Sequence, residues 1–270
     1  MVKKMDEKKV IDFNSLKKEY QEKELENKEE LKNERQAEEY FLKAKSSEDN
    51  EVKYELAHTA FILCPYKYYY EVYAVLFLKK DQKLEALKRI YNYINNGIEN
   101  KNPYFKEDEK KSAKYGYFLY TYACSLIEYR YLDEALKLLL ELEDNNYRFK
   151  AVHLILNIYA YQNEFKKLIE FYNINKYEDV SSFIPLSYAY LKLDKYKEFV
   201  DLIKKINIIN PNFKEVLNNA NENRLENCSN ENYKIADSSE IYYAFKYFYK
   251  LYYLNQEYLK AVNNILDEND

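Results

Sequence analysis

The 270-residue chain contains no tryptophan, only two glycines and only four prolines. All-β folds need a turn signal about every 8–12 residues, and glycine and proline supply most of those turns. A nucleotide-binding α/β fold needs a glycine-rich turn, yet neither GxGxxG nor GxxxxGK[ST] occurs in the sequence. The composition therefore disfavours both classes and predicts an all-α protein.

Cysteines and long apolar runs are also scarce. Cys64, Cys124 and Cys228 are widely separated and form no CxxC pair, so neither a disulfide framework nor a structural zinc site is predicted. No uncharged apolar run reaches about 18 residues, and residues 1–21 lack the apolar stretch of a signal peptide. We therefore expect a cytoplasmic protein with no membrane insertion.

The charge balance is slightly acidic. The chain has 42 basic and 46 acidic residues, a formal net charge of −4. A general nucleic-acid binder usually has a net basic balance, so this composition disfavours nucleic-acid partners. The 33 tyrosines accompany abundant Lys, Asn and Ile. These four residue types have AT-rich codons, and we attribute their excess to an AT-rich genome.

A turn followed by an anchoring residue recurs along the chain. The anchors Ala135, Leu168 and Phe199 are 33 and 31 residues apart. Ala86 and the AHTAFILCP block that ends at Pro65 extend the series upstream. A period in the low thirties is typical of stacked two-helix repeats. The spacing therefore predicts an α-solenoid of antiparallel helical hairpins.

Apolar periodicity and capping signals place the individual helices. Residues 46–49 form a turn and a cap for a helix that Pro65 ends. The later helices are predicted in pairs: Tyr68–Lys79 with Gln82–Asn95, Ala113–Tyr129 with Leu132–Glu143, Arg148–Tyr161 with Glu164–Tyr172, and Ser181–Lys192 with Lys195–Asn207.

Three regions are predicted. Residues 1–36 form a charged N-terminal helix or a partly disordered arm, and residues 37–212 form the repeats, with an inserted loop at 95–112. Residues 213–270 contain a polar loop and two C-terminal capping helices, at 241–254 and 256–266. The helix at 241–254 is too apolar to face water, so we expect it to pack onto the last repeat.

Equivalent positions in three successive units carry similar residues. They are Ala123, Leu126, Arg130, Leu132 and Ala135; then Leu156, Tyr159, Asn163, Phe165 and Leu168; then Leu186, Tyr190, Asp194, Tyr196 and Phe199, followed by Pro211. This pattern resembles the tetratricopeptide-repeat family over residues 37–212. The long insertion and the C-terminal apolar helix are similar to those of a group of bacterial proteins in that family, so the resemblance implies a bacterial protein. The turn glycine of that family is replaced at three positions and its tryptophan is absent, so we expect irregular repeats.

The resemblance implies that the first helix of each hairpin lines a concave groove that holds a segment of a partner protein. Tyrosine suits this role because it presents a rigid ring with a polar tip. We therefore predict a non-catalytic scaffold or adaptor, with no cofactor. The predicted partner-binding residues are Glu71, Val75, Lys79, Tyr120, Glu128, Lys150, His153, Asn157, Tyr161, Ile184, Tyr188 and Lys192, with Cys124 on the same side.

The alternative function is single-stranded RNA binding through lysines interleaved with aromatic residues, as at 66–70 and 245–253. Helical spacing instead places Tyr242, Phe245, Tyr249 and Tyr252 on one core-facing stripe. A carboxylate clamp built from Lys150 and Asn157 lacks matching residues in the other units.

Catalysis and metal binding are not predicted. His58 and His153 are the only histidines, and one His with one Cys does not complete a zinc site. A Cys124–His153 pair lacks an orienting third group and an oxyanion site. We therefore expect no enzyme activity.

Overall fold

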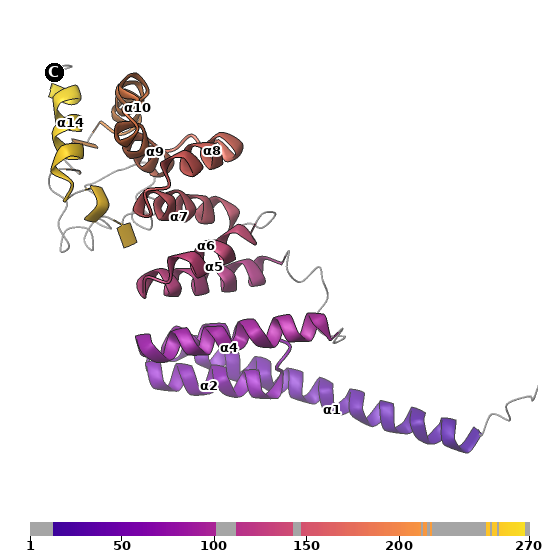
Figure 1. The fold of residues 1–270 in the computed structure, drawn as a ribbon. Helices are drawn as coiled ribbons and strands as arrows, with labels where there is room; N and C mark the ends of the chain where they lie inside the picture. The colour runs from indigo at the N-terminus through magenta and orange to yellow at the C-terminus, as the bar shows by residue number, and fades with distance from the viewer. Residues whose placement is uncertain are drawn as a thin grey trace, which may run out of the picture. The chain divides into compact units, whose positions relative to one another are not determined.

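A computed structural model of the chain describes residues 13–100, 112–142, 147–211, 213–214, 217, 247–248, 250–252 and 254–267. The regular secondary structure in these ranges is helical and includes no strand, which confirms the all-α class (Figure 1). The chain divides into two compact units, Met1–Lys106 and Glu107–Asp270, here called unit 1 and unit 2. Each is described by itself.

In unit 1, each helix packs against the next along the chain. Small residues at the α1–α2 contact let these two helices approach closely, and Ala37, Ala44, Ala57 and Ala60 have no exposed surface. The ring of Phe41 completes this core by packing against three tyrosines that come after α2 in the sequence, Tyr69, Tyr70 and Tyr73. The helices are α1 (Phe13–Ser46), α2 (Asn50–Leu63), α3 (Tyr69–Val75) and α4 (Lys80–Glu99).

Local signals set both ends of α2 as predicted. The Asp49 carboxylate accepts hydrogen bonds from the backbone N–H groups of Glu51, at 2.8 Å, and Val52, at 3.1 Å. It therefore satisfies donors that have no partner within the helix. At the other end, the helix stops at Leu63, two residues before Pro65.

Three boundaries in unit 1 differ from the prediction. Helix α1 is continuous across position 36, where a boundary was expected. Helix α3 ends at Val75, because the next three N–H groups bond to carbonyls three residues back in tight turns. Helix α4 continues past Asn95 to Glu99, into the loop predicted at 95–112, and the Asn95 side chain donates to the Tyr91 carbonyl. Residues 101–111 of that loop lie outside the described residues.

In unit 2, each helix from α5 to α10 packs on the next, α7 also packs on α9, and α10 packs on α14. In Figure 1 the helices follow one another upward from α5 toward α10. The helices are α5 (Ala113–Glu128), α6 (Leu132–Leu140), α7 (Arg148–Tyr161), α8 (Phe165–Asn175), α9 (Val180–Lys192), α10 (Tyr196–Ile209) and α14 (Gln256–Asp267).

Three turns in unit 2 have the same backbone geometry. Arg130, Asn163 and Asp194, which stand where the resembled family has a turn glycine, have φ values of 65°, 58° and 56°. In each turn the N–H of the following residue bonds to the carbonyl five residues earlier, at 3.0, 2.9 and 2.9 Å. This left-handed helix ending is a common way to close a helix and start the next one. The turns therefore repeat at the spacing of the sequence pattern.

Within the described part of the chain, no helix combines the length and the apolar character that crossing a bilayer requires. Cys64 is buried and Cys124 is partly exposed.

Candidate functional site

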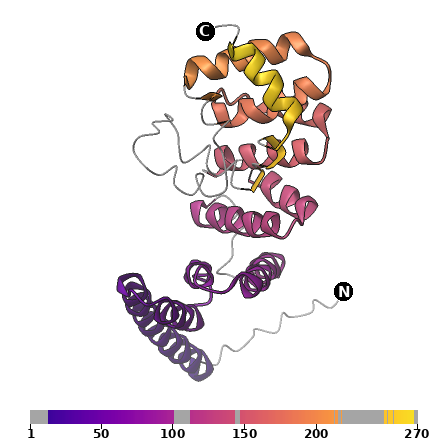
Figure 2. The same cartoon turned by 90° about the vertical axis from the view of Figure 1, so that its left-hand side faces the viewer.

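The described residues of 247–258, here called the C-terminal segment, lie against α5, α7 and α9 of unit 2. The residues of unit 2 that they contact are here called the inner face: Glu128, Arg130, Asn157, Tyr161, Ser187, Tyr188 and Lys192. In Figures 1 and 2 the C-terminal residues, in yellow, run beside these helices. Segments far apart in sequence thus form one site.

A buried hydrogen-bond chain anchors the centre of the C-terminal segment. The Tyr252 hydroxyl donates to Asn157 Oδ1 at 2.6 Å, and Asn157 Nδ2 donates to the His153 carbonyl at 2.7 Å. Tyr252 and Asn157 are each only 1% exposed. A buried amide left without partners destabilises a fold, so these bonds fix the position of Tyr252 on α7.

Tyr188 of α9 lies at the centre of an aromatic cluster. Its ring meets the rings of Tyr252 and Tyr258 edge-on, with centroids 5.6 Å away in both cases. Asn255 Nδ2 donates to the Tyr188 hydroxyl at 3.2 Å. The Tyr258 and Ser187 hydroxyls lie 2.7 Å apart in a buried hydrogen bond. Shape and polar contacts together therefore specify the register of the segment on α9.

Two contacts on α5 and at the turn after it hold the start of the segment. The Tyr247 hydroxyl donates to Glu128 Oε1 at 3.5 Å, and Arg130 Nη1 donates to the Tyr247 carbonyl at 3.4 Å. The Arg130 guanidinium also lies 5.1 Å from the centre of the Tyr161 ring, which packs against Phe248. At the other end of the segment, the Lys192 ammonium pairs with the Glu257 carboxylate.

Burial keeps the tyrosine hydroxyls of this site protonated. Loss of hydration is the main cause that raises the pKa of Tyr247, Tyr252 and Tyr258 above the ordinary value for tyrosine. The neighbouring Cys124 and Glu128 raise the pKa of Tyr247 further. The three hydroxyls are therefore neutral at physiological pH and can both donate and accept hydrogen bonds.

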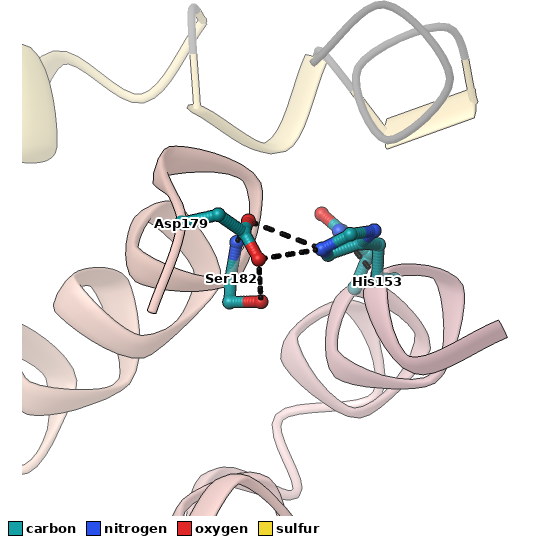
Figure 3. Close-up of polar contacts among 4 residues, drawn as sticks. His153, Asp179 and Ser182 are labelled. Atoms are coloured by element: carbon teal, nitrogen blue, oxygen red, sulfur yellow. Dashed lines mark hydrogen bonds and ion pairs between the residues drawn. The ribbon is translucent and has the colours of Figure 1, made fainter. Parts of the chain in front are cut away.

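His153 lies beside Asp179, the residue that caps α9 (Figure 3). Its Nε2 lies 3.1 Å from both carboxylate oxygens of Asp179, which caps α9 by accepting from the Ser182 N–H at 2.9 Å. Ser182 Oγ donates to the same carboxylate at 3.3 Å. The acid therefore lies between the serine and the histidine. In a nucleophilic triad the histidine must lie between the acid and the serine, so these three residues do not have the order of a triad. Their hydrogen bonds instead connect α7 to the start of α9.

The structure places the predicted groove residues in different environments. Val75 has no exposed surface, Glu71 is 8% exposed, and both belong to unit 1 with Lys79, which is exposed. In unit 2, most are buried under neighbouring helices or the C-terminal segment, so in this structure they are not surface residues. The buried ones are Tyr120, His153, Asn157, Ile184 and Tyr188; Glu128 and Lys192 are partly exposed; Lys150 and Tyr161 are exposed.

The C-terminal helix expected at 241–254 was predicted to pack onto the last repeat. Its described residues do contact that repeat, because Tyr252 packs against Tyr188 of α9. Tyr247 and Tyr252 also contact residues of α5 and α7, which was not predicted. The sequence signal was the aromatic stripe, of which Tyr252 is buried as expected; Tyr242, Phe245 and Tyr249 fall outside the described residues. Periodicity predicted a buried face but could not identify the helices that cover it.

Comparison with known proteins finds no protein family that matches this chain and no curated protein that matches it. The tetratricopeptide resemblance thus stays a prediction. Among the described side chains, no group of three or more His, Cys, Asp or Glu residues is arranged to hold a metal ion.

Proposed function

We propose that unit 2 is a non-catalytic protein-interaction module whose inner face binds an aromatic helical segment of a partner protein. The observation that carries the proposal is the hydrogen bond of Tyr252 to Asn157, with the aromatic cluster around Tyr188. Tyr252 is 95 residues from Asn157 in sequence, so the C-terminal segment contacts the face as a separate ligand would.

The helical repeats supply a rigid support for such a face. The recurring left-handed turns and the order of helix packing favour an α-solenoid of tetratricopeptide-like hairpins. Recognition of a helix through aromatic residues one turn apart is a common way for a protein to bind a peptide. Phe248 and Tyr252 have this i, i+4 spacing. A partner with the same spacing would replace the C-terminal segment. Its apparent affinity would depend on the fraction of molecules in which that segment is detached from the inner face.

A labelled peptide tests the proposal. The probe is residues 245–260 with a fluorescein at the N-terminus, and the hosts are the full chain and its Tyr252→Ala variant. We expect the peptide to bind Tyr252→Ala at least about tenfold more tightly than the unaltered chain, because the internal segment no longer competes. Tyr131→Ala, which removes an exposed tyrosine, is the matched control and should bind like the unaltered chain.

Further variants locate the binding surface. Adding Asn157→Ala to Tyr252→Ala should abolish peptide binding, and Lys192→Ala should weaken it several-fold at low salt. Glu257→Lys places like charges together and weakens the internal segment without removing core volume, so it is a second host if Tyr252→Ala fails to fold. Circular dichroism reports folding. Equal binding to all folded hosts, or binding unaffected by Asn157→Ala, would disprove the assignment of the inner face.

Peptide display on the Glu257→Lys variant then defines the partner chemistry. We expect enrichment of peptides with aromatic residues four apart, as in residues 248–252, followed by an acidic residue that can reach Lys192. Enrichment of unrelated peptides would refute the proposed ligand class. Tight binding of single-stranded RNA with a steep loss of affinity at moderate salt would support the alternative function instead.

A further inference from the structure

A pocket of about 540 Å³ lies within unit 1, between α2, α3 and α4. Its volume falls in the usual range for small-molecule sites, roughly 300–1,000 Å³. Aromatic rings form much of the wall, contributed by Tyr54 and Phe61 of α2 and by Tyr93 of α4. Three groups that can carry charge, His58, Glu71 and Arg89, line the same space.

Glu71 contributes a buried carboxylate to the pocket. The residue is 8% exposed, and its Oε2 lies 2.7 Å from Nδ1 of His58. The imidazole of His58 stacks on the Tyr54 ring, with 5.5 Å between centroids and an angle of 7° between the planes. Contacts on both sides therefore hold the histidine in place, and the histidine in turn positions the carboxylate.

The second oxygen of Glu71 is available to a ligand. Oε1 has no hydrogen-bond partner among the described groups. This oxygen is not sealed from solvent. Solvent in the pocket can thus reach this oxygen, and it can accept a hydrogen bond from a bound donor.

Arg89 supplies the opposite charge. Its side chain is exposed, and it forms no ion pair with any carboxylate in the described ranges. A guanidinium stays protonated in proteins and presents paired N–H donors that match a carboxylate. The pocket therefore offers an acceptor for a cation, a donor for an anion, and aromatic walls.

We propose that this pocket binds a small zwitterion with an aromatic or apolar side chain, of the size of an α-amino acid. Its ammonium group bonds to Glu71 Oε1, its carboxylate bonds to Arg89, and its side chain packs against the rings. Aromatic faces also attract an ammonium group, which adds to the selectivity. This site does not depend on the function proposed for unit 2.

Three probes with the same phenyl skeleton test the charge requirement. The full chain is titrated with L-phenylalanine, with phenethylamine, which keeps only the cation, and with 3-phenylpropionate, which keeps only the anion. Saturation-transfer NMR reports binding. We expect L-phenylalanine to bind at least about tenfold more tightly than either analogue, because each analogue leaves one charged group without a partner.

Variants assign each charge to its residue. Glu71→Gln should weaken phenylalanine binding about tenfold and leave 3-phenylpropionate unchanged, while Arg89→Leu should weaken phenylalanine and leave phenethylamine unchanged. Lys88→Leu, at an exposed neighbour that does not line the pocket, is the matched control and should bind like the unaltered chain. If Glu71→Gln fails to fold, the exposed Arg89 still permits the test. No saturable phenylalanine binding below about 10 mM, or equal affinity in all variants, would overturn the proposal.

Discussion

Single turn residues in unit 2 adopt a backbone conformation that most residue types avoid. Asp194 has a φ of 56°, and its side chain is exposed. Aspartate and asparagine tolerate this region better than other non-glycine residues, and a β-branched side chain clashes there. This explains how the chain closes its hairpins with so few glycines.

The first prediction concerns this turn. Asp194→Val should lower the free energy of unfolding by about 2 kcal/mol, whereas Asp194→Gly should leave it within about 1 kcal/mol of the unaltered value. Urea unfolding measures both. The same pair at Lys204, exposed within α10, should reverse the order, because valine suits a helix interior better than glycine. The same order at both positions would contradict the assigned turn geometry.

Buried tyrosines make the stability of unit 2 sensitive to high pH. Burial raises the pKa of Tyr258 in the folded chain, whereas an unfolded tyrosine ionises near pH 10. A raised pKa means that the stabilisation is fully present below about pH 10. It is lost as the pH rises further, because the unfolded chain releases a proton that the folded chain retains.

The second prediction follows from this sign. Urea unfolding between pH 8 and 11 should give a free energy of unfolding that falls above about pH 10. Tyr258→Phe should make that fall shallower by up to about 1.4 kcal/mol per pH unit. The variant also loses the hydrogen bond to Ser187, so the slopes, and not the absolute values, are compared. Identical slopes would show that Tyr258 does not stay protonated in the folded chain.

At the scale of the element, α9 begins with a cap that also joins it to α7. Asp179 accepts from the Ser182 N–H, and its two oxygens lie 3.1 Å from His153 Nε2. Asp49 caps α2, and among the described residues its bonds are only to its own turn and helix. Comparing substitutions at Asp49 and Asp179 therefore distinguishes the effect of losing a cap from the effect of losing a contact between helices.

The third prediction uses this difference. Asp179→Ala should lower the free energy of unfolding by about 2 kcal/mol or more, because it removes a cap and the partner of a buried histidine. Asp179→Asn keeps the cap and should lower it less. Asp49→Ala should lower it by about 1 kcal/mol. Thermal unfolding followed by circular dichroism checks the series, and equal losses for Asp179→Ala and Asp49→Ala would exclude a role for the His153 contact.

At the scale of the whole molecule, each unit is stabilised by contacts between distant parts of the sequence. In unit 2 the Tyr252 hydroxyl bonds to Asn157, and in unit 1 the Tyr70 hydroxyl bonds to Glu38 at 2.6 Å. Both tyrosines are almost fully buried. Removing one hydroxyl therefore perturbs one unit through a single bond.

The fourth prediction compares these two hydroxyls by amide hydrogen exchange of the full chain. Tyr252→Phe should lower protection in α7 and α9 by about 1–3 kcal/mol of opening free energy and leave α1 and α2 unchanged. Tyr70→Phe should affect α1 and the helices of unit 1 that pack with it, and leave α7 and α9 unchanged. Loss of protection in both units from either variant would mean that they do not unfold independently.

Local sequence was sufficient for the elements themselves. Helix α7 spans Arg148–Tyr161, as the apolar periodicity predicted, and Asp49 and Pro65 mark the ends of α2 as expected. The three turns lie at the positions that the repeat pattern predicted, although their left-handed backbone was not predicted. These features depend on interactions within about one helical turn, so residue type and spacing are enough to predict them.

Only the tertiary structure decided what covers the apolar faces and which polar groups meet. The sequence predicted a buried stripe that includes Tyr252, but not that its hydroxyl would bond to Asn157. It also gave no sign that Glu71 would meet His58 beside an aromatic pocket. The physical reason is that periodicity specifies how much of a helix is buried. The partner of each buried group depends on contacts that form only when distant helices pack together.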